Sequence, residues 1–202
     1  MRITANRTIG FLLVLSPALA AFHGLSSPLT LQPDSRLWVE GTSNVRPFEC
    51  EATKLNVQVE TAERGAAQRI VAGEKAVRTV IVTVPSESLD CDKGNKKMNE
   101  HMLKAIKADA NPSIEFRLSS YDLARDSAGT LAVLNGTLKL GGAEKAVTIN
   151  AAARAVSEGV LQVTGAYELR MTDYGLKPPK LMMGAFKVND PITVNFDLLL
   201  KE

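Results

Sequence analysis

Apolar and polar side chains alternate along most of the chain, and this period of two predicts β-strands. In residues 51–60, for example, Leu55, Val57 and Val59 alternate with polar or charged side chains. The pattern recurs, so that about eight strands are predicted, over residues 36–42, 51–60, 80–84, 114–118, 130–140, 147–153, 161–171 and 192–200. Strands that each have one apolar face predict an all-β fold, an antiparallel sheet curled into a barrel around its own interior.

The inward phase of this alternation identifies the side chains expected to face the interior of the barrel. These predicted lumen residues are Leu55, Val57, Val59, Val80, Val82, Ile114, Phe116, Leu118, Ile149, Val163, Tyr167, Leu169, Val194 and Phe196. Small residues recur on the same phase at Ala151, Ala153 and Gly165, which favours a channel. An eight-stranded barrel can be filled by side chains or can hold one slender ligand, so a filled core is the alternative.

One segment has a helical period instead. In residues 93–107, Met98, Met102 and Ile106 recur at every fourth position among lysines, which predicts one amphipathic helix that ends before Asn111-Pro112. Residues 61–75 have no clear period and are expected to form a solvated connection. Residues 173–191 are too long for a hairpin turn, and their Met182 and Met183 are predicted to be adaptable contacts at a mouth of the barrel.

The dipeptide Asn135-Gly136 allows two interpretations. Asn-Gly between alternating apolar residues is a strong signal for a two-residue β-hairpin turn. The alternative is one continuous strand over 130–140, with a kink or bulge at Gly136 and the turn displaced to Gly141-Gly142.

The first twenty residues have the three parts of a secretory signal peptide. Arg2 and Arg7 precede an apolar run, and Ala18-Leu19-Ala20 provides a small-residue cleavage site. We therefore expect a signal peptide over 1–20, a flexible lead over 21–35, a barrel domain over 36–202, and a periplasmic or secreted location. The residue directly after the cleavage site is not a cysteine, and no later segment is a candidate transmembrane helix, so a stable membrane anchor is not expected.

Charge argues against a nucleic-acid partner. Of the 24 basic residues, Arg2 and Arg7 belong to the leader, which leaves 22 against 22 acidic residues, and no basic cluster contains interleaved aromatic residues. Catalytic motifs are also missing, since there is no G-x-S-x-G elbow and His101 is the only histidine beyond His23. We therefore expect no enzymatic activity and no cofactor.

The two cysteines, Cys50 and Cys91, are predicted to form a disulfide, because an exported chain meets an oxidising compartment. A competing interpretation is a soft-metal site, since Cys91 is close in sequence to Met98, His101 and Met102. A disulfide would remove the thiolate, and methionines at helical spacing usually fill a core, so we expect no metal ligand here.

Three segments, in order, resemble the YceI-like family of exported bacterial proteins. They are "VTVPSESLDCDKGNKKMNEHMLKAIKADANPSIEFRLSS", "GTLKLGGAEKAVTINAAA" and "MTDYGLKPPKLMMGAFKVNDPITVNFDLLL". The resemblance implies a lipocalin-like eight-stranded antiparallel barrel, a single strand over 130–140, and a bound polyisoprenoid chain. Many members have histidines where this chain reads "VEGTSNVRPFEC" and "KLGGAEKAV", so any role of those histidines does not carry over.

Together these features predict an exported, non-enzymatic protein that holds an isoprenoid or another long-chain lipid in its barrel. Two alternatives are a periplasmic soft-metal or redox-linked protein, and a filled barrel that acts in a stress response through a protein partner. The oligomeric state, a homodimer included, is left open by the sequence.

Overall fold

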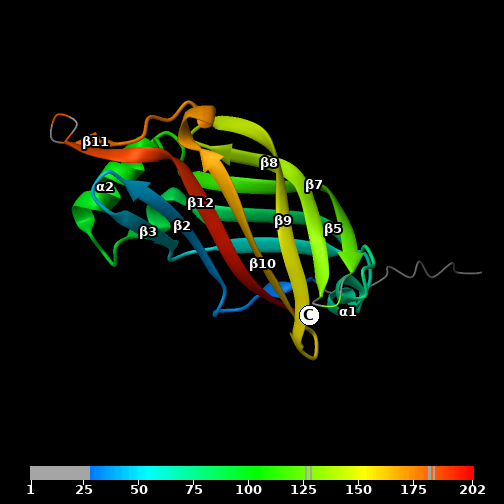
Figure 1. Ribbon diagram of the computed structural model, residues 1–202. Coiled ribbons are helices and arrows are strands. Elements are labelled where there is room, and N and C mark those ends of the chain that lie inside the picture. Colours follow the sequence, from blue (N-terminus) through cyan, green and yellow to red (C-terminus); the bar gives the residue numbers. More distant parts are fainter. Residues whose placement is uncertain (1–27, 126, 128, 182, 184) are drawn as a thin grey trace, which may run out of the picture.

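Antiparallel pairing joins the strands into one curled sheet (Figure 1). The computed structural model describes residues 28–125, 127, 129–181, 183 and 185–202. The sheet order is β4-β5-β7-β8-β9-β10-β12-β2-β3-β6, and the short strands β1 and β11 pair with β12. The strands are β1 (Thr30–Leu31), β2 (Arg36–Ser43), β3 (Pro47–Ala52), β4 (Asn56–Thr61), β5 (Val77–Pro85), β6 (Leu89–Cys91), β7 (Ser113–Arg125), β8 (Thr130–Leu140), β9 (Ala143–Ser157), β10 (Val160–Arg170), β11 (Lys180–Leu181) and β12 (Phe186–Lys201).

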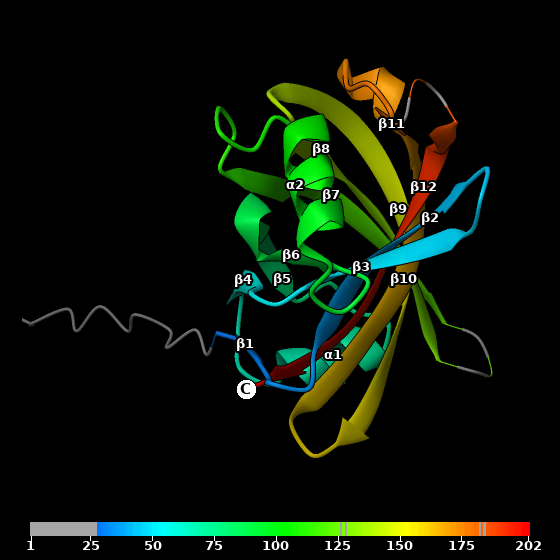
Figure 2. The same ribbon diagram turned by 90° about the vertical axis from the view of Figure 1, so that its left-hand side faces the viewer.

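Helical segments connect the strands in the described part of the chain. They are α1 (Ala66–Val71), η1 (Ser86–Ser88), α2 (Lys96–Ala105) and η2 (Met171–Tyr174), where η denotes a 3₁₀ turn. Figure 2 looks at one end of the curled sheet, with α2 lying across that end, and Figure 1 shows α1 at the opposite end. In the part of the chain that the structure describes, no helix is long and apolar enough to cross a membrane.

The predicted antiparallel all-β class is confirmed, but the strand count is larger than eight. The main difference is at residues 51–60, which were predicted as one strand. After β2 the chain turns at Ser43 and returns as β3. The hydroxyl and the backbone N–H of Ser43 both donate hydrogen bonds to the Arg46 carbonyl oxygen. It then leaves β3 at Ala52, crosses over residues 53–55, and begins β4 at Asn56. Leu55 therefore lies in a connection and not in a strand.

The sheet is curled but open, because β4 and β6 are the two ends of the strand order and no pairing between them exists in the described residues. An isolated bridge between Leu29 and Val59 joins the segment before β1 to the β4 edge. Leu29 is only 2% exposed, so the predicted flexible lead of residues 21–35 is ordered from Leu29 onward. The predicted signal peptide and residues 21–27 lie outside the described residues.

The connection over residues 61–75 is not the solvated loop that we expected. It contains α1, which begins after Gly65 (φ 75°) and places Ala66, Ala67 and Ile70 in the core. These side chains pack with Leu29 and other apolar residues from β4, β9, β10 and β12. One end of the barrel is therefore closed by a short apolar helix.

The predicted helix over residues 93–107 is present as α2, with narrower bounds. Asp92, Lys93 and Gly94 have positive φ and form a turn, so the helix begins only after Asn95, whose side chain accepts a hydrogen bond from the Met98 backbone N–H. At the other end Lys107 has a φ of 57°, which terminates the helix. Ten residues are helical, and the helix lies across the end of the barrel (Figure 2).

Residues 130–140 form one strand, β8, as the family resemblance implied, and Asn135-Gly136 is not a hairpin turn. The turn lies at Gly141 and Gly142, whose φ angles are 57° and 87°. A register shift in the pairing with β7, between Leu118 and Ser120, lies opposite Gly136. The extra residue of this bulge is Ser119 on β7, so β8 itself continues through Gly136 in regular pairing with β9 and does not reverse.

The C-terminal loop is shorter than predicted. Residues 173–191 were expected to be a loop, but β12 already begins at Phe186. Pro191 lies inside β12, where the pairing with β2 shifts register between Val188 and Ile192. This irregularity accommodates a residue that has no N–H group to donate to the ladder.

Candidate ligand-binding cavity

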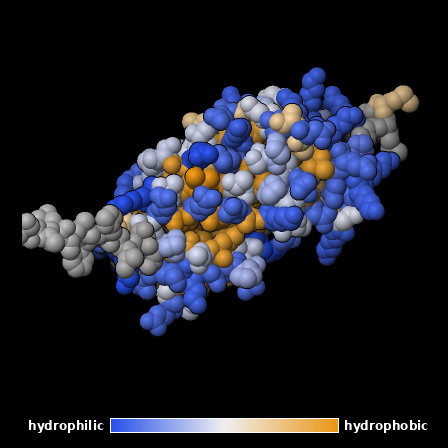
Figure 3. Space-filling view, turned by 180° about the vertical axis from the view of Figure 1, so that it is seen from behind, coloured by the Kyte–Doolittle hydropathy of each residue, from blue (hydrophilic) through white to orange (hydrophobic). Residues whose placement is uncertain are grey.

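An apolar cavity of about 480 Å³ fills the space inside the curled sheet and runs from α1 to α2. Its size falls within the roughly 300–1,000 Å³ that is common for ligand pockets. Figure 3, drawn from behind the view of Figure 1, shows part of this interior as an apolar strip framed by hydrophilic side chains. The interior is therefore hollow and reachable, as expected for a sheet whose edge strands do not pair.

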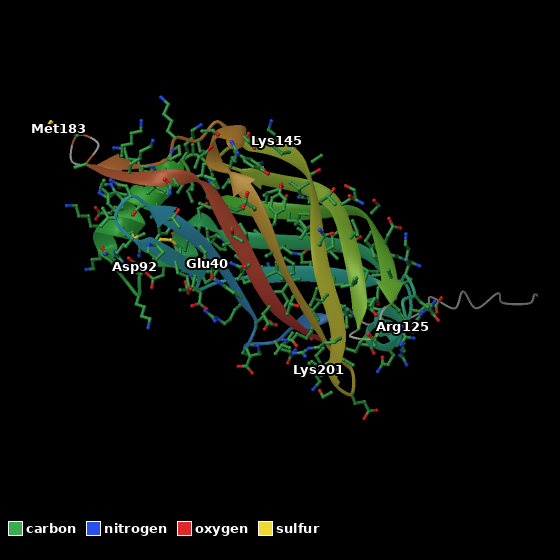
Figure 4. The ribbon with its side chains drawn as sticks, in the orientation of Figure 1. Glu40, Asp92, Arg125, Lys145, Met183 and Lys201 are labelled. Atoms are coloured by element: carbon green, nitrogen blue, oxygen red, sulfur yellow. A yellow bond between two sulfur atoms is a disulfide. The ribbon has the colours of Figure 1, made fainter. Side chains whose placement is uncertain are left out.

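All the predicted lumen residues except Leu55 line this cavity. Leu55 is absent from the wall because the chain crosses between strands at that point. Of the two predicted mouth residues, Met182 lies outside the described residues. Met183 is fully exposed (109%) at the tip beyond β11 and points away from the cavity (Figure 4).

Several wall residues were not predicted. Leu37, Val39 and Leu138 lie on strands that we expected, and extending the same alternation would have identified them. Phe48 lies on β3, which the sequence analysis did not separate from its neighbours. Ile70 comes from α1, and a six-residue helix is too short to show a clear period.

Three phenylalanine rings on the cavity wall lie close against glycines. A Cβ atom built on each glycine would lie 2.3–2.5 Å from a ring carbon; the pairs are Gly41 with Phe48, Gly136 with Phe116, and Gly165 with Phe196. Gly41–Phe48 and Gly165–Phe196 are direct partners across neighbouring strands. Because a glycine has no side chain, the ring can lie against the backbone instead of extending into the bore, which helps to keep the bore open.

The polar side chains that line the cavity gather at the α2 end. They are Arg46 from the β2–β3 turn, Asn95 before α2, and Lys97 and His101 on α2. Two tyrosines, Tyr121 and Tyr167, also line the cavity. The Tyr121 hydroxyl is already hydrogen-bonded to the backbone of Val77. None of the described residues that line the cavity is an aspartate or a glutamate.

Cys50 and Cys91 form a disulfide, and both line the cavity. They are direct partners in the pairing of β3 with β6, and α2 follows β6 after a short turn. Asn99 of α2 accepts a hydrogen bond from the Cys91 backbone N–H (2.7 Å) and donates one to Asp90 (2.8 Å). The proposed thiolate ligand is therefore consumed, and the described residues contain no group of three or more His, Cys, Asp or Glu placed to hold a metal ion.

Two side chains near η2, beside the α2 end of the cavity, have pKa values that are shifted from the usual ones. Burial raises the pKa of Tyr174 to about 12, with a smaller contribution from the neighbouring Tyr167. A hydrogen bond from the Thr172 hydroxyl, together with one from its backbone N–H, holds the pKa of Asp190 below its usual range. Asp190 thereby fastens η2 to β12.

The fold and its cavity can be compared with known proteins. A family model described as the YceI-like domain matches residues 38–200. The chain belongs to the YceI-like family. No curated protein gave a match.

Solved structures show the same fold at low sequence identity. BcnA of Burkholderia cenocepacia has a TM-score of 0.62 at 19% identity, with 82% of this chain and 95% of that chain covered. A YceI protein of Campylobacter jejuni has a TM-score of 0.57 at 15% identity, covering 80% and 84%. A polyisoprenoid binding domain from Saccharophagus degradans has a TM-score of 0.57 at 11% identity, covering 86% and 97%.

Proposed function

We propose that this protein binds one long-chain lipid of the isoprenoid class in its bore and carries it without chemical change. The observation that supports this most directly is the apolar cavity that runs from α1 to α2 inside the sheet. Each CH₂ group that leaves water contributes about 0.8 kcal/mol, so a long hydrocarbon needs little more than such a wall for tight binding.

Two further observations support the proposal. The polyisoprenoid binding domain of Saccharophagus degradans has the same fold. The rings of Phe48, Phe116 and Phe196 lie against glycines, which spares the bore from being filled. A protein whose interior served only for stability would gain from filling such a space, because empty apolar volume costs free energy.

We also propose that the protein is exported to the periplasm or secreted. The signal-peptide pattern of residues 1–20 and the disulfide between Cys50 and Cys91 both support this location. Mass spectrometry of the mature chain purified from its host should give Ala21 as the first residue. An intact Met1 on the purified protein would contradict export through this signal.

The bore is tested by placing a charge on its wall. Phe116→Arg should lower the affinity for an added polyprenol at least about tenfold, because a guanidinium in the apolar bore must be desolvated when the chain enters. Lys54→Glu changes an exposed side chain in the β3–β4 connection and should leave the affinity unchanged. Native mass spectrometry and the shift of the melting temperature on adding polyprenol measure both.

A second variant tests the bore independently, in case Phe116→Arg does not fold. Val82 is the cross-strand partner of Phe116 and also lines the cavity, so Val82→Phe should reduce uptake by occupying the bore while remaining apolar. Wild-type protein that carries no lipid adduct and whose melting temperature does not respond to polyprenol would contradict lipid binding. Equal effects of Phe116→Arg and Lys54→Glu would contradict the assignment of the bore.

A further inference from the structure

We propose that the α2 end of the cavity is a binding site for the anionic, oxygen-bearing head group of a prenyl lipid, formed by Lys97 and His101 with Arg46 beside them. We call these three residues the head-group site. The inference rests on the proposed function for the lipid tail, and it adds which end of the lipid is recognised and by what chemistry. A prenyl phosphate is the ligand class that it specifies.

The first observation is an unsatisfied nitrogen on the cavity wall. His101 lines the cavity, and its Nε2 atom is buried with no hydrogen-bond partner in the described residues. A buried polar atom without a partner costs free energy, and a hydrocarbon in the bore would leave it unsatisfied. An oxygen on the ligand could accept a hydrogen bond from the Nε2–H tautomer, or donate one to the other tautomer.

The second observation is the arrangement of α2. Lys97 and His101 are four residues apart, so they lie one above the other on the helix. Met98 and Met102, also four apart, form a neighbouring row, and all four side chains line the cavity. The helix therefore presents an apolar row beside a polar row, which matches a ligand that has a hydrocarbon tail and a polar end.

The third observation is the sign of the charge. Arg46 and Lys97 contribute positive side chains to the cavity wall, and no carboxylate of the described residues lines it. Arg46 pairs with Asp92, whereas Lys97 has no ion-pair or hydrogen-bond partner in the part of the chain that the structure describes. An unpaired ammonium beside an unsatisfied imidazole favours an anionic head group over a neutral or cationic one.

Among the described residues, the opposite end of the cavity has no comparable group. It is lined by apolar side chains from the cluster around α1, and the Tyr121 hydroxyl nearby is already bonded to Val77. As far as the described residues line it, the cavity is therefore charged and rich in hydrogen-bonding groups at its α2 end and apolar at its α1 end. The lipid should bind with its tail toward α1 and its head group beside α2.

The test compares three ligands with chains of the same length: geranylgeranyl phosphate, geranylgeraniol and the hydrocarbon phytane. Delipidated wild-type protein should bind the phosphate at least about tenfold more tightly than phytane, with the alcohol in between. His101→Phe keeps a ring of similar size and should lower the affinity for the phosphate and the alcohol about tenfold. Its affinity for phytane should be unchanged.

Two more variants separate hydrogen bonding from charge. His101→Gln retains a donor and an acceptor and should recover part of the affinity lost in His101→Phe. Lys97→Gln should lower the affinity for the phosphate alone, by roughly threefold, and this loss should shrink at high salt because the lysine is exposed. Lys104→Gln is the matched control, since Lys104 is on α2 but does not line the cavity.

Several outcomes would overturn the head-group site. Equal affinity of the wild type for all three ligands would show that the head group is not recognised. An equal loss for all three ligands in His101→Phe would make His101 a packing residue. Equal affinity for the alcohol and the phosphate, with no effect of Lys97→Gln, would exclude the anionic class. If none of the three ligands binds, the proposed function itself fails, which is a distinguishable result.

Discussion

At the scale of single residues, the glycines of the sheet have a packing role that composition does not reveal. Gly41 is the clearest case, because the three atoms nearest to a Cβ built on it all belong to the Phe48 ring, at 2.3–2.9 Å. At Gly136 and Gly165 a backbone oxygen is also within 2.7 Å of that position. A side chain at any of these positions would have to displace a ring toward the bore.

Gly41→Ala should therefore destabilise the protein by about 1–3 kcal/mol, the usual range for inserting a group into a packed site. In a Phe48→Ala background the ring is gone, and the same change should be neutral or slightly stabilising, since alanine loses less backbone entropy than glycine on folding. Urea denaturation of the four proteins of this cycle gives the coupling energy. Equal losses in both backgrounds would show that the ring does not cause the effect.

Tyr174 gives the protein a predictable response to alkaline pH. It is 3% exposed, and burial raises its pKa to about 12 from a usual 10.0. Between these values the unfolded chain ionises the phenol and the folded chain does not, so unfolding releases a proton. The stabilisation is complete below pH 10 and is lost as the pH rises through 12, an effect of about 2–3 kcal/mol.

The measurement is the free energy of unfolding between pH 9 and pH 12 for the wild type and for Tyr174→Phe. Ionisations of other groups are common to both proteins and cancel in the difference. The wild type should lose stability relative to Tyr174→Phe over this interval. Parallel pH dependences would contradict a buried phenol at this position.

At the scale of elements, β6 and α2 depend on each other. β6 has only three residues and lies at the edge of the sheet, where it pairs with β3 alone. The disulfide joins it to β3, and the hydrogen bonds of Asn99 join it to α2. Since α2 carries Lys97 and His101, the position of the head-group site depends on this edge strand.

Removing the disulfide tests this dependence. The Cys50→Ala/Cys91→Ala variant should lose about 3–4 kcal/mol of stability, because the bond closes a loop of 41 residues in the unfolded chain. Hydrogen exchange should rise over residues 89–105 more than elsewhere, since β6 and α2 lose their covalent attachment to β3. Uniform exchange across the chain would contradict a local role.

A thiol assay is the accompanying control. The unfolded, unreduced wild type should contain no free thiol, because both cysteines are in the disulfide. Two free thiols would show that the disulfide is absent. Cys91 would then again be a candidate soft-metal ligand beside Met98, His101 and Met102.

Elements differ in how well the sequence predicts them. β10 is long and alternates regularly, and its predicted bounds match closely. For β8 the local pattern allowed a hairpin as well, and the single strand was implied by the family resemblance. α1 has six residues, and only its contacts with Leu29 and with β9 and β10 decide that it forms and is buried. β3, β6 and β11 are likewise short, and short strands are stabilised by their neighbours more than by their own pattern.

At the scale of the whole molecule, the shape of the sheet decides what the interior can do. The edges β4 and β6 do not pair with each other in the described residues, and helices lie at both ends of the curled sheet. An interior that is closed at the α1 end by apolar packing, and bordered by polar side chains at the α2 end, gives the cavity a direction. No single element contains this asymmetry.

The sequence by itself determined the all-β class, the antiparallel arrangement, the amphipathic helix and the disulfide partners. All but one of the predicted lumen residues line the cavity. These features follow from local periodicity and from having only two cysteines, and a period of two places alternate side chains on one face wherever the strand lies. The error at Leu55 arose because alternation continues through a connection that leaves the sheet.

Only the tertiary structure decided the rest. The close contacts of phenylalanine rings with Gly41, Gly136 and Gly165 depend on which strands are neighbours, and α1 depends on the end of the barrel that it closes. His101 had no structural assignment in the sequence, because whether a polar atom has a partner depends on residues brought together by folding. A hollow interior is decided in the same way, since the enclosed volume is a property of the whole curled sheet and not of any strand.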